Sequence, residues 1–319
     1  MKIAFFGTPK FSAEILQDLI EKGMHISAVI TQPDKLQGRH LKLQESCVKK
    51  VARDLLPQIP LLQPERVSHE TFVHALSQIE ADLFVVVAFG QIFPKLLLEM
   101  PRLGCVNVHT SLLPKYRGAA PIQRCLMQGE VETGCSVMYM AEKCDAGDVL
   151  AVKKIPIPPD MNAGELTLAL CEISKELLYP TLLKLAEGKI KPQPQDTTLV
   201  TFAKKVTPDV AQIHWNQEAK SLYNQFRGVT PKPGAWCFVL IKGKKLRLKL
   251  IEVGLSDLSG KPGKILAYEN EGIVIACKKK SLSLKTIQLE GKKALNAHSF
   301  IRGCSLEEIS FLETESTAL

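Results

Sequence analysis

An amide, an imidazole and a carboxylate stand out among the side chains of this 319-residue chain. Asn107 and His109 end an alternating apolar stretch, Gly104–His109, so both side chains point to the same side of a predicted strand. Asp145 follows the next apolar stretch. Together they suit the transfer of an acyl group to an amine. The amide and the imidazole can donate to the oxyanion of the tetrahedral intermediate, and the carboxylate can accept the proton that the attacking nitrogen loses.

No side-chain nucleophile is needed for such a reaction. An α-amino group has a reference pKa of roughly 7.7–8.0, so it is partly neutral at cellular pH and can attack by itself. Taken singly, the three residues have structural alternatives. A lone His after a strand often makes only structural hydrogen bonds, an isolated Asn caps or turns the chain, and an Asp two residues before a Gly is a common turn residue.

A sharp turn and a helix follow the strand that ends at His109. Pro114 and Gly118 interrupt the chain, and Ala119–Gln128 is predicted as a helix with Pro121 in its first turn. Open α/β sheets bind their ligands at such strand ends. The pattern therefore predicts that the polar groups face a binding cleft.

The extended pattern around these residues resembles the signature of the folate-dependent formyltransferases. The matching positions are Asn107-x-His109, Ser111-Leu112-Leu113-Pro114, Arg117-Gly118-x-Ala120-Pro121-x-Gln123 and Asp145-Ala146-Gly147-Asp148. Within the family, the chain is most similar to the members that formylate methionyl-tRNA, from Met1 to about Gly303. The resemblance implies transfer of a formyl group from 10-formyltetrahydrofolate to the amino group of initiator methionyl-tRNA, for translation initiation. It assigns the catalytic roles to Asn107, His109 and Asp145.

The resemblance also implies binding residues. Folate would be held largely by backbone groups of Phe89, Gly90, Gln91 and Ile92 and by the loop Ser111, Leu112, Leu113 and Pro114. Gly90 would let the backbone approach a flat ligand closely, whereas core packing is the alternative for the Phe89 ring. The loop 32–42, with Arg39 and Lys42, matches an insertion directed at the acceptor end of tRNA, although composition alone indicates only a flexible loop. Further candidate tRNA contacts are Lys204, Lys205, Lys242, Lys244, Lys245 and Arg247.

All of the excess positive charge lies in the C-terminal part of the chain. Residues 1–200 hold 22 Lys and Arg against 22 Asp and Glu, while residues 201–319 hold 19 against 11. The run Lys242–Lys249 alternates basic and apolar residues, so one strand face is cationic and the other enters a core. A solvated surface is the alternative, and for Lys278–Lys280 alone an exposed turn is the better interpretation. The asymmetry favours a partner with a phosphate backbone.

Alternating helices and strands predict a doubly wound, mostly parallel α/β domain over residues 1–188, with a Rossmann-like sheet. The polar, proline-interrupted stretch 189–206 is predicted as a linker. Short β-rich segments over residues 207–319 predict a smaller OB-like β-barrel that binds tRNA. The turn Gly7–Pro9 lacks a dinucleotide-binding pattern, and Ser12 is a candidate cap for the helix that follows it.

Composition indicates a globular protein, with 45% hydrophobic and 23% charged residues. Its longest apolar runs, such as Leu83–Phe89, fall far short of the ~20 residues of a membrane span, and Met1–Gly7 reads as a buried strand rather than a signal peptide. Nine cysteines without a Cys-x-x-Cys pair and seven dispersed histidines predict reduced thiols and no metal site. We expect a cytoplasmic monomer without membrane association.

Two other functions remain open at this point. One is a folate formyltransferase that acts on a small amine such as a nucleotide sugar, which would leave the basic second domain unexplained. The other is a non-catalytic RNA-binding protein on the same fold, against which the intact Asn107, His109 and Asp145 argue.

Overall fold

The computed structural model describes residues 1–37, 42–269, 272–304 and 306–312. The chain divides into two compact units. Unit 1 comprises Met1–Pro121, Glu132–Pro156 and Thr167–Ala203, and unit 2 comprises Ile122–Val131, Ile157–Leu166 and the chain from Lys204 on. Most of the predicted linker, residues 189–203, thus groups with unit 1, whereas two segments of the predicted first domain group with unit 2.

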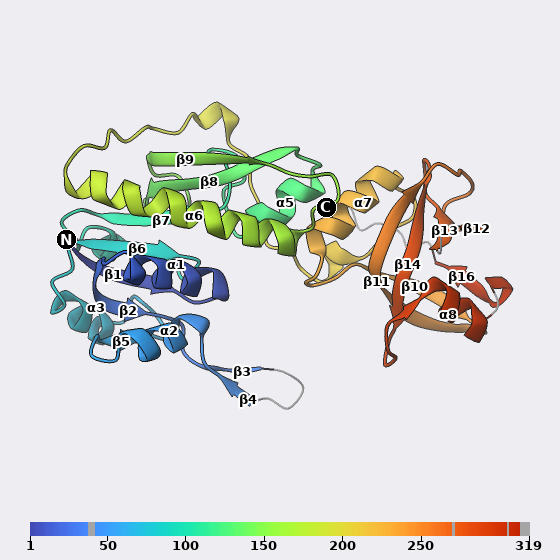
Figure 1. Cartoon of the computed structure of the whole chain (residues 1–319), viewed down its shortest axis with the longest axis horizontal. Coiled ribbons are helices and arrows are strands. Elements are labelled where there is room, and N and C mark those ends of the chain that lie inside the picture. Colours follow the sequence, from blue (N-terminus) through green and yellow to red (C-terminus); the bar gives the residue numbers. More distant parts are fainter. Residues whose placement is uncertain (38–41, 270–271, 305, 313–319) are drawn as a thin grey trace. The chain divides into compact units, whose positions relative to one another are not determined.

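A seven-stranded sheet forms the centre of unit 1, in the order β5-β2-β1-β6-β7-β8-β9 (Figure 1). Five strands run parallel, and β8 and β9 are antiparallel to their neighbours, which confirms the predicted mostly parallel sheet. The strands are β1 (Lys2–Gly7), β2 (His25–Ile30), β5 (Leu61–Leu62), β6 (Leu83–Val87), β7 (Cys105–His109), β8 (Glu132–Tyr139) and β9 (Val149–Pro156).

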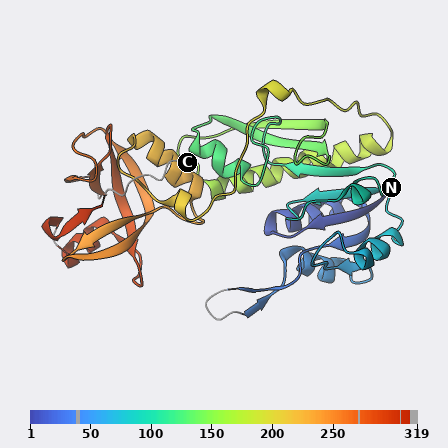
Figure 2. The ribbon, with the colours of Figure 1, turned by 180° about the vertical axis from the view of Figure 1, so that it is seen from behind.

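Helices cover both faces of this sheet. One core joins the sheet to α1 (Lys10–Glu21), α2 (Cys47–Leu55) and α6 (Ala163–Ala186). A second core joins the other face to α3 (Glu70–Ser77) and α4 (Lys95–Leu98). Figure 1 shows α1 and α6 lying along the sheet, and Figure 2 shows the same elements from behind. Side chains alternate between the two cores along the central strands β1 and β6, as the period of a strand requires.

The first helix begins differently from the sequence prediction. Pro9 is the N-cap residue of α1, without a side-chain cap bond. Ser12 is fully buried, and its hydroxyl donates to the Val87 carbonyl at 2.5 Å. Ser12 is therefore not the cap. It ties α1 to the carboxyl end of β6.

Two short strands lie in and just after the predicted flexible loop 32–42. β3 (Lys35–Gln37) pairs antiparallel with β4 (Lys42–Gln44). At the base of this pair, the Asp34 carboxylate accepts hydrogen bonds from Lys49 (2.6 Å) and Gln63 (2.8 Å). Arg39 lies outside the described residues.

Unit 2 is built on an antiparallel sheet, in the order β12-β13-β14-β11-β10-β16 with β15 beside β14. It confirms the predicted OB-like barrel. The strands are β10 (Trp236–Ile241), β11 (Lys244–Ser256), β12 (Ile265–Glu269), β13 (Gly272–Ala276), β14 (Ser281–Leu289), β15 (Leu295–Asn296) and β16 (Ile309–Phe311). Its core, around the fully buried Trp215, also receives α7 (Ala219–Val229) and α8 (Ala297–Gly303).

A buried arginine on α7 contacts both of the segments, 122–131 and 157–166, that group with unit 2. Only 4% of Arg227 is exposed, and its guanidinium donates to the carbonyls of Met161 (3.4 Å) and Leu126 (3.5 Å). Burial lowers the pKa of Arg227. Leu126 lies on α5 (Pro121–Met127), the helix predicted after the turn.

In the described part of the chain, no helix is both long and apolar enough to cross a membrane.

Candidate active site

Strand β7 places Asn107 and His109 on one face of the unit 1 sheet. Val106 and Val108 pack into the core on the opposite face, so the alternation is as predicted. His109 is buried, with 5% of its surface exposed, and Asn107 is half-buried. Among the described residues, the Asn107 side-chain amide has no hydrogen-bond partner. Its N–H groups therefore remain available to an incoming oxygen.

The His109 ring lies between a carbonyl and a carboxylate. Its Nε2 is 2.9 Å from the Tyr116 carbonyl, and its Nδ1 is 3.7 Å from Asp145 Oδ1. Because a carbonyl only accepts, Nε2 carries a hydrogen and donates to Tyr116. A ring protonated on both nitrogens would face both oxygens with a donor, whereas the neutral ring leaves Nδ1 as an acceptor. Nδ1 is therefore the ring nitrogen that faces Asp145.

Asp145 is held at the middle of this arrangement. Only 11% of its side chain is exposed, and its Oδ2 accepts the backbone N–H of Gly118 at 2.7 Å. Its own φ is 54°, in the left-handed region that non-glycine residues seldom adopt. The structure therefore brings together two of the predicted catalytic side chains, His109 and Asp145. Asn107 shares the strand and the face of His109.

The turn after β7 is fixed by hydrogen bonds that the sequence did not predict. Ser136 on β8 donates to the Ser111 carbonyl at 2.7 Å and accepts from the Leu113 N–H at 3.2 Å. Thr201, in the predicted linker, accepts from the Tyr116 N–H through its hydroxyl at 2.8 Å. Its carbonyl accepts from the Arg117 N–H at 2.9 Å. Ser136 is 25 positions from Ser111, and Thr201 is 85 positions from Tyr116. No local sequence pattern indicates that residues so distant fix this turn.

The folate residues implied by the resemblance have diverse environments. The Ser111 hydroxyl is buried and donates to the Lys115 carbonyl at 2.6 Å. The Phe89 ring is 2% exposed and belongs to a core cluster with Phe6 and Phe93. It is therefore not placed at the surface of a cleft. Ile92 is 81% exposed. The other three residues of the loop after β7, Leu112, Leu113 and Pro114, are half-buried.

The turn after β6 offers open backbone. Gly90 has a φ of 91°, and a Cβ there would meet nothing within 4 Å. Ala88, exposed, also has a positive φ of 45°. The Gln91 side chain accepts from the Val67 N–H at 2.8 Å, which anchors this turn. A flat ligand could therefore approach the backbone at Gly90 without a steric obstacle.

The predicted cationic strand face is present in unit 2. Leu248 and Leu250 are buried, while Lys245 and Arg247 are exposed on the alternate positions. Both cations lie over aromatic rings of β10: Lys245 Nζ is 4.2 Å from the Phe238 ring centre and Arg247 Cζ is 3.9 Å from that of Trp236. The further candidates Lys242, Lys244, Lys204 and Lys205 are exposed, and no side-chain placement is described for Lys42.

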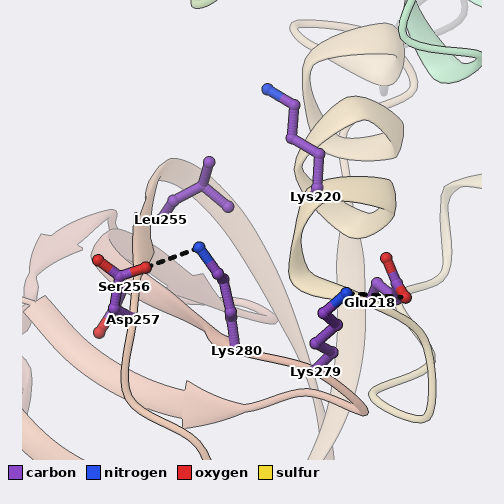
Figure 3. A pocket seen from close by; sticks show the side chains of 7 residues that line it. All are labelled: Glu218, Lys220, Leu255, Ser256, Asp257, Lys279 and Lys280. Atoms are coloured by element: carbon purple, nitrogen blue, oxygen red, sulfur yellow. Dashed lines mark hydrogen bonds and ion pairs between the residues drawn. The ribbon is translucent and has the colours of Figure 1, made fainter.

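A hollow of about 340 Å³ lies on unit 2, between the start of α7 and the end of β11 (Figure 3). Its lysines are largely paired: Lys280 lies 2.8 Å from Asp257, and Lys279 lies 3.9 Å from Glu218. These pairs cancel much of the positive charge, which favours the exposed-turn interpretation of Lys278–Lys280.

One group of potential metal ligands, Glu14, Cys171 and Glu172, brings its ligand atoms within 4.8 Å of one another. Lys10 and Lys175 already pair with Glu14, at 3.4 and 3.8 Å. The chain's own cations thus neutralise this carboxylate.

The reactivity of the Cys144 thiol depends on the neighbouring Asp145 carboxylate. Although the residue is exposed, its sulfur lies 3.4 Å from Asp145 Oδ2, and desolvation together with that charge raises the pKa of Cys144 to about 11. We expect iodoacetamide at pH 8 to alkylate Cys144 roughly 10²-fold more slowly than a free thiol, because the thiolate is the nucleophile. The rate should rise with pH up to about 11. Peptide mass spectrometry would measure it, and an alkylation rate equal to that of a free thiol would contradict this prediction.

Comparison with known proteins places this site in a family. The family model "Formyl transferase" matches residues 1–182, and "Formyl transferase, C-terminal domain" matches residues 205–305. The chain is 42% identical over 313 residues to the methionyl-tRNA formyltransferase of Protochlamydia amoebophila, covering 98% of each chain. It is 43% identical over 309 residues to that of Chlamydia abortus, covering 96% of each.

Among solved structures, the sugar 3N-formyl transferase WlaRD, determined in the presence of dTDP and 5-N-formyl-THF, has the same fold. Its TM-score is 0.66 at 18% identity, covering 92% of this chain and 99% of that one. Fold, family models and full-length similarity agree: the chain belongs to the formyl transferase family and, within it, to the methionyl-tRNA formyltransferases.

Proposed function

We propose that this protein transfers the formyl group of 10-formyltetrahydrofolate to the amino group of initiator methionyl-tRNA. The observation that carries the proposal is the contact of His109 with Asp145 beside Asn107, at the carboxyl end of β7. It occurs in a chain that is similar to methionyl-tRNA formyltransferases over nearly its full length.

In the proposed mechanism, the methionyl nitrogen attacks the formyl carbon and a C–N bond forms. The formyl oxygen becomes an oxyanion, to which the Asn107 amide donates. The His109 ring donates as well, once its Nε2–H exchanges the Tyr116 carbonyl for the oxyanion. Asp145 accepts the proton that the nitrogen loses, directly or through one water. The bond between the formyl carbon and N10 of the folate then breaks, and N10 takes up a proton as tetrahydrofolate leaves.

We propose that the folate lies against the open backbone at Gly90 and the half-buried loop Ser111–Pro114. The contribution of Phe89, Gln91 and Ile92 would come from their backbone groups. The Phe89 ring is in the core, and the Gln91 side chain is engaged with Val67.

We propose that the tRNA contacts the exposed cations of unit 2, namely Lys204, Lys205, Lys242, Lys244, Lys245 and Arg247. The pairing of Lys245 and Arg247 with aromatic rings holds two of these cations in place on one strand face. The proposed role of Arg39 and Lys42, at the acceptor end of the tRNA, rests on the family resemblance. A cytoplasmic monomer is part of the same proposal.

Neutralising four barrel cations should weaken tRNA binding and flatten its salt dependence. In the variant with Gln at positions Lys242, Lys244, Lys245 and Arg247, each lost phosphate contact lowers the log–log salt slope by about 0.7–0.9. Filter binding from low to moderate salt measures both quantities. The matched control replaces the exposed lysines Lys10, Lys50, Lys95 and Lys154 of unit 1 by Gln. An unchanged slope in the barrel variant would mean that these cations only face solvent.

The full chain is the right material for this comparison. A fragment ending near residue 205 would leave residues 122–131 and 157–166 without the unit 2 groups that they contact, such as Arg227.

The choice of acceptor tests the proposed function. The protein and 10-formyltetrahydrofolate are incubated with charged initiator tRNA, free methionine or a nucleotide-linked amino sugar in separate reactions. Transfer to the charged tRNA should exceed transfer to the other two amines. Preference for the amino sugar would point to a small-amine formyltransferase, and no transfer to any acceptor would point to a non-catalytic RNA-binding protein.

A further inference from the structure

The segment that follows α6 runs along the candidate active site of unit 1. Gln193 forms a two-way backbone bridge with Val149, at 2.8 and 2.9 Å. Residues 201–203 then pair with the turn after β7, where the Ala203 N–H donates to the Arg117 carbonyl at 2.7 Å. Gln195 lies between these two attachments and is half-buried.

The Gln195 side-chain amide joins two parts of the site. Its Nε2 donates to the carbonyls of Asp145 (2.9 Å) and Gly147 (2.7 Å). Its Oε1 accepts from Nε (3.0 Å) and Nη2 (2.8 Å) of Arg117. Two donors and two acceptor positions are the full capacity of a carboxamide. The partners also fix its orientation, because carbonyls only accept and a guanidinium only donates.

The two segments that Gln195 joins together determine where the Asp145 carboxylate lies. Asp145 has a left-handed backbone, which needs support from its surroundings. Its carboxylate binds the N–H of Gly118, the residue after Arg117, and faces the His109 ring. A bridge from Arg117 to the 145–147 backbone therefore fixes the separation of the two segments that set these contacts.

We infer that Gln195 is a positioning residue for Asp145, clamping the 145–147 turn to Arg117 so that the carboxylate stays in reach of His109 and the attacking amine. The inference rests on the proposed function, in which Asp145 is the proton acceptor. Gln195 touches no substrate in this scheme. It acts through the placement of Asp145.

The test compares Gln195→Ala and Gln195→Glu with Gln193→Ala, a matched control whose exposed amide donates only to the Lys191 carbonyl among the described residues. At saturating folate and charged tRNA, Gln195→Ala should lower the single-turnover rate roughly 10–10²-fold, as expected for a small misplacement of a catalytic group. Affinity for both substrates should stay within about twofold. Gln193→Ala should match the wild type.

Gln195→Glu separates positioning from simple attachment of the segment. A carboxylate keeps the interaction with Arg117 but places an oxygen against the carbonyls of Asp145 and Gly147, where no donor remains. The rate should therefore fall at least as far as in Gln195→Ala. A wild-type rate in either variant would overturn the inference, as would recovery in Gln195→Glu.

Two further measurements make the result specific to Asp145. In an Asp145→Asn background, Gln195→Ala should cost much less than it does in the wild type, because both changes remove the same function. An equal cost in both backgrounds would overturn the inference. The alkylation rate of Cys144 at pH 8 should rise in Gln195→Ala and not in Gln193→Ala, since the Asp145 carboxylate suppresses the Cys144 thiolate. This alkylation measurement does not depend on formyl transfer, so it tests the contact of Gln195 with the 145–147 turn even if the proposed function is wrong.

Discussion

Asn107→Ala and His109→Ala should each lower the single-turnover rate of formyl transfer by about 10²–10³-fold, the usual cost of removing one oxyanion donor. Both side chains stand on one face of β7, and the Asn107 amide is unengaged among the described residues, so its deletion breaks no internal hydrogen bond. Circular dichroism and rapid-quench assays at saturating substrates would show an intact fold with slow transfer.

The controls are Asn216→Ala and His25→Ala, which remove the same groups from exposed positions. Both should leave the rate unchanged. His109→Ala also removes the hydrogen bond from the ring to the Tyr116 carbonyl, so its effect on stability should exceed that of Asn107→Ala. Wild-type turnover in folded Asn107→Ala or His109→Ala would remove that residue from the oxyanion site.

Asp145→Asn should lower the rate of the bound complex by about 10²–10⁴-fold, the range for loss of a general base. The amide oxygen of the new side chain can still accept from the Gly118 N–H, so the turn and the folate affinity should survive. Equilibrium folate binding combined with single-turnover rates separates the two effects. Alkylation of Cys144 should become faster, because loss of the charge lowers the thiol pKa.

Glu142→Gln is the matched control, since it removes an exposed carboxylate from the same β8–β9 connection. It should change neither rate nor affinity. If folate binding collapses in Asp145→Asn while the bound complex reacts at the normal rate, then Asp145 is a binding residue and not the proton acceptor.

The elements that carry these residues could be predicted because their signals are local. Alternation from Gly104 to His109 predicts β7 and the shared side of Asn107 and His109, since side chains alternate along any strand. The Lys242–Lys249 pattern predicts a cationic face in the same way. Both depend only on neighbours in sequence.

The contacts that hold the site could not be predicted in this way. Gln195 binds the Asp145 carbonyl from 50 positions away, and Ser12 binds Val87 from 75 positions away. Each is a side-chain bond to a backbone group, which any polar residue could make. A proline-interrupted stretch such as 189–206 therefore looks like a linker, even though its Gln195 and Thr201 are hydrogen-bonded to the backbone of Asp145 and Tyr116.

The division into two units could not be predicted either, because it depends on contacts between segments that are far apart in the sequence. Composition shifts near residue 200 and suggests one boundary there, but residues 122–131 and 157–166 group with unit 2. Buried Arg227 and the Tyr223 hydroxyl, which donates to Asp160 at 2.8 Å, hold these segments. Such grouping depends on tertiary contacts that no sequence period encodes.

The most direct test of the central claim follows the formyl carbon itself. Excess protein is mixed with 10-formyltetrahydrofolate labelled in the formyl group and with methionyl initiator tRNA, and the reaction is stopped within a single turnover. We expect the label to elute with the RNA and to be released by mild base as N-formylmethionine, and we expect Asn107→Ala and Asp145→Asn to slow its transfer strongly. Two results would contradict the proposed function: label that stays on the folate, or label that reaches methionine as fast in the two variants as in the wild type.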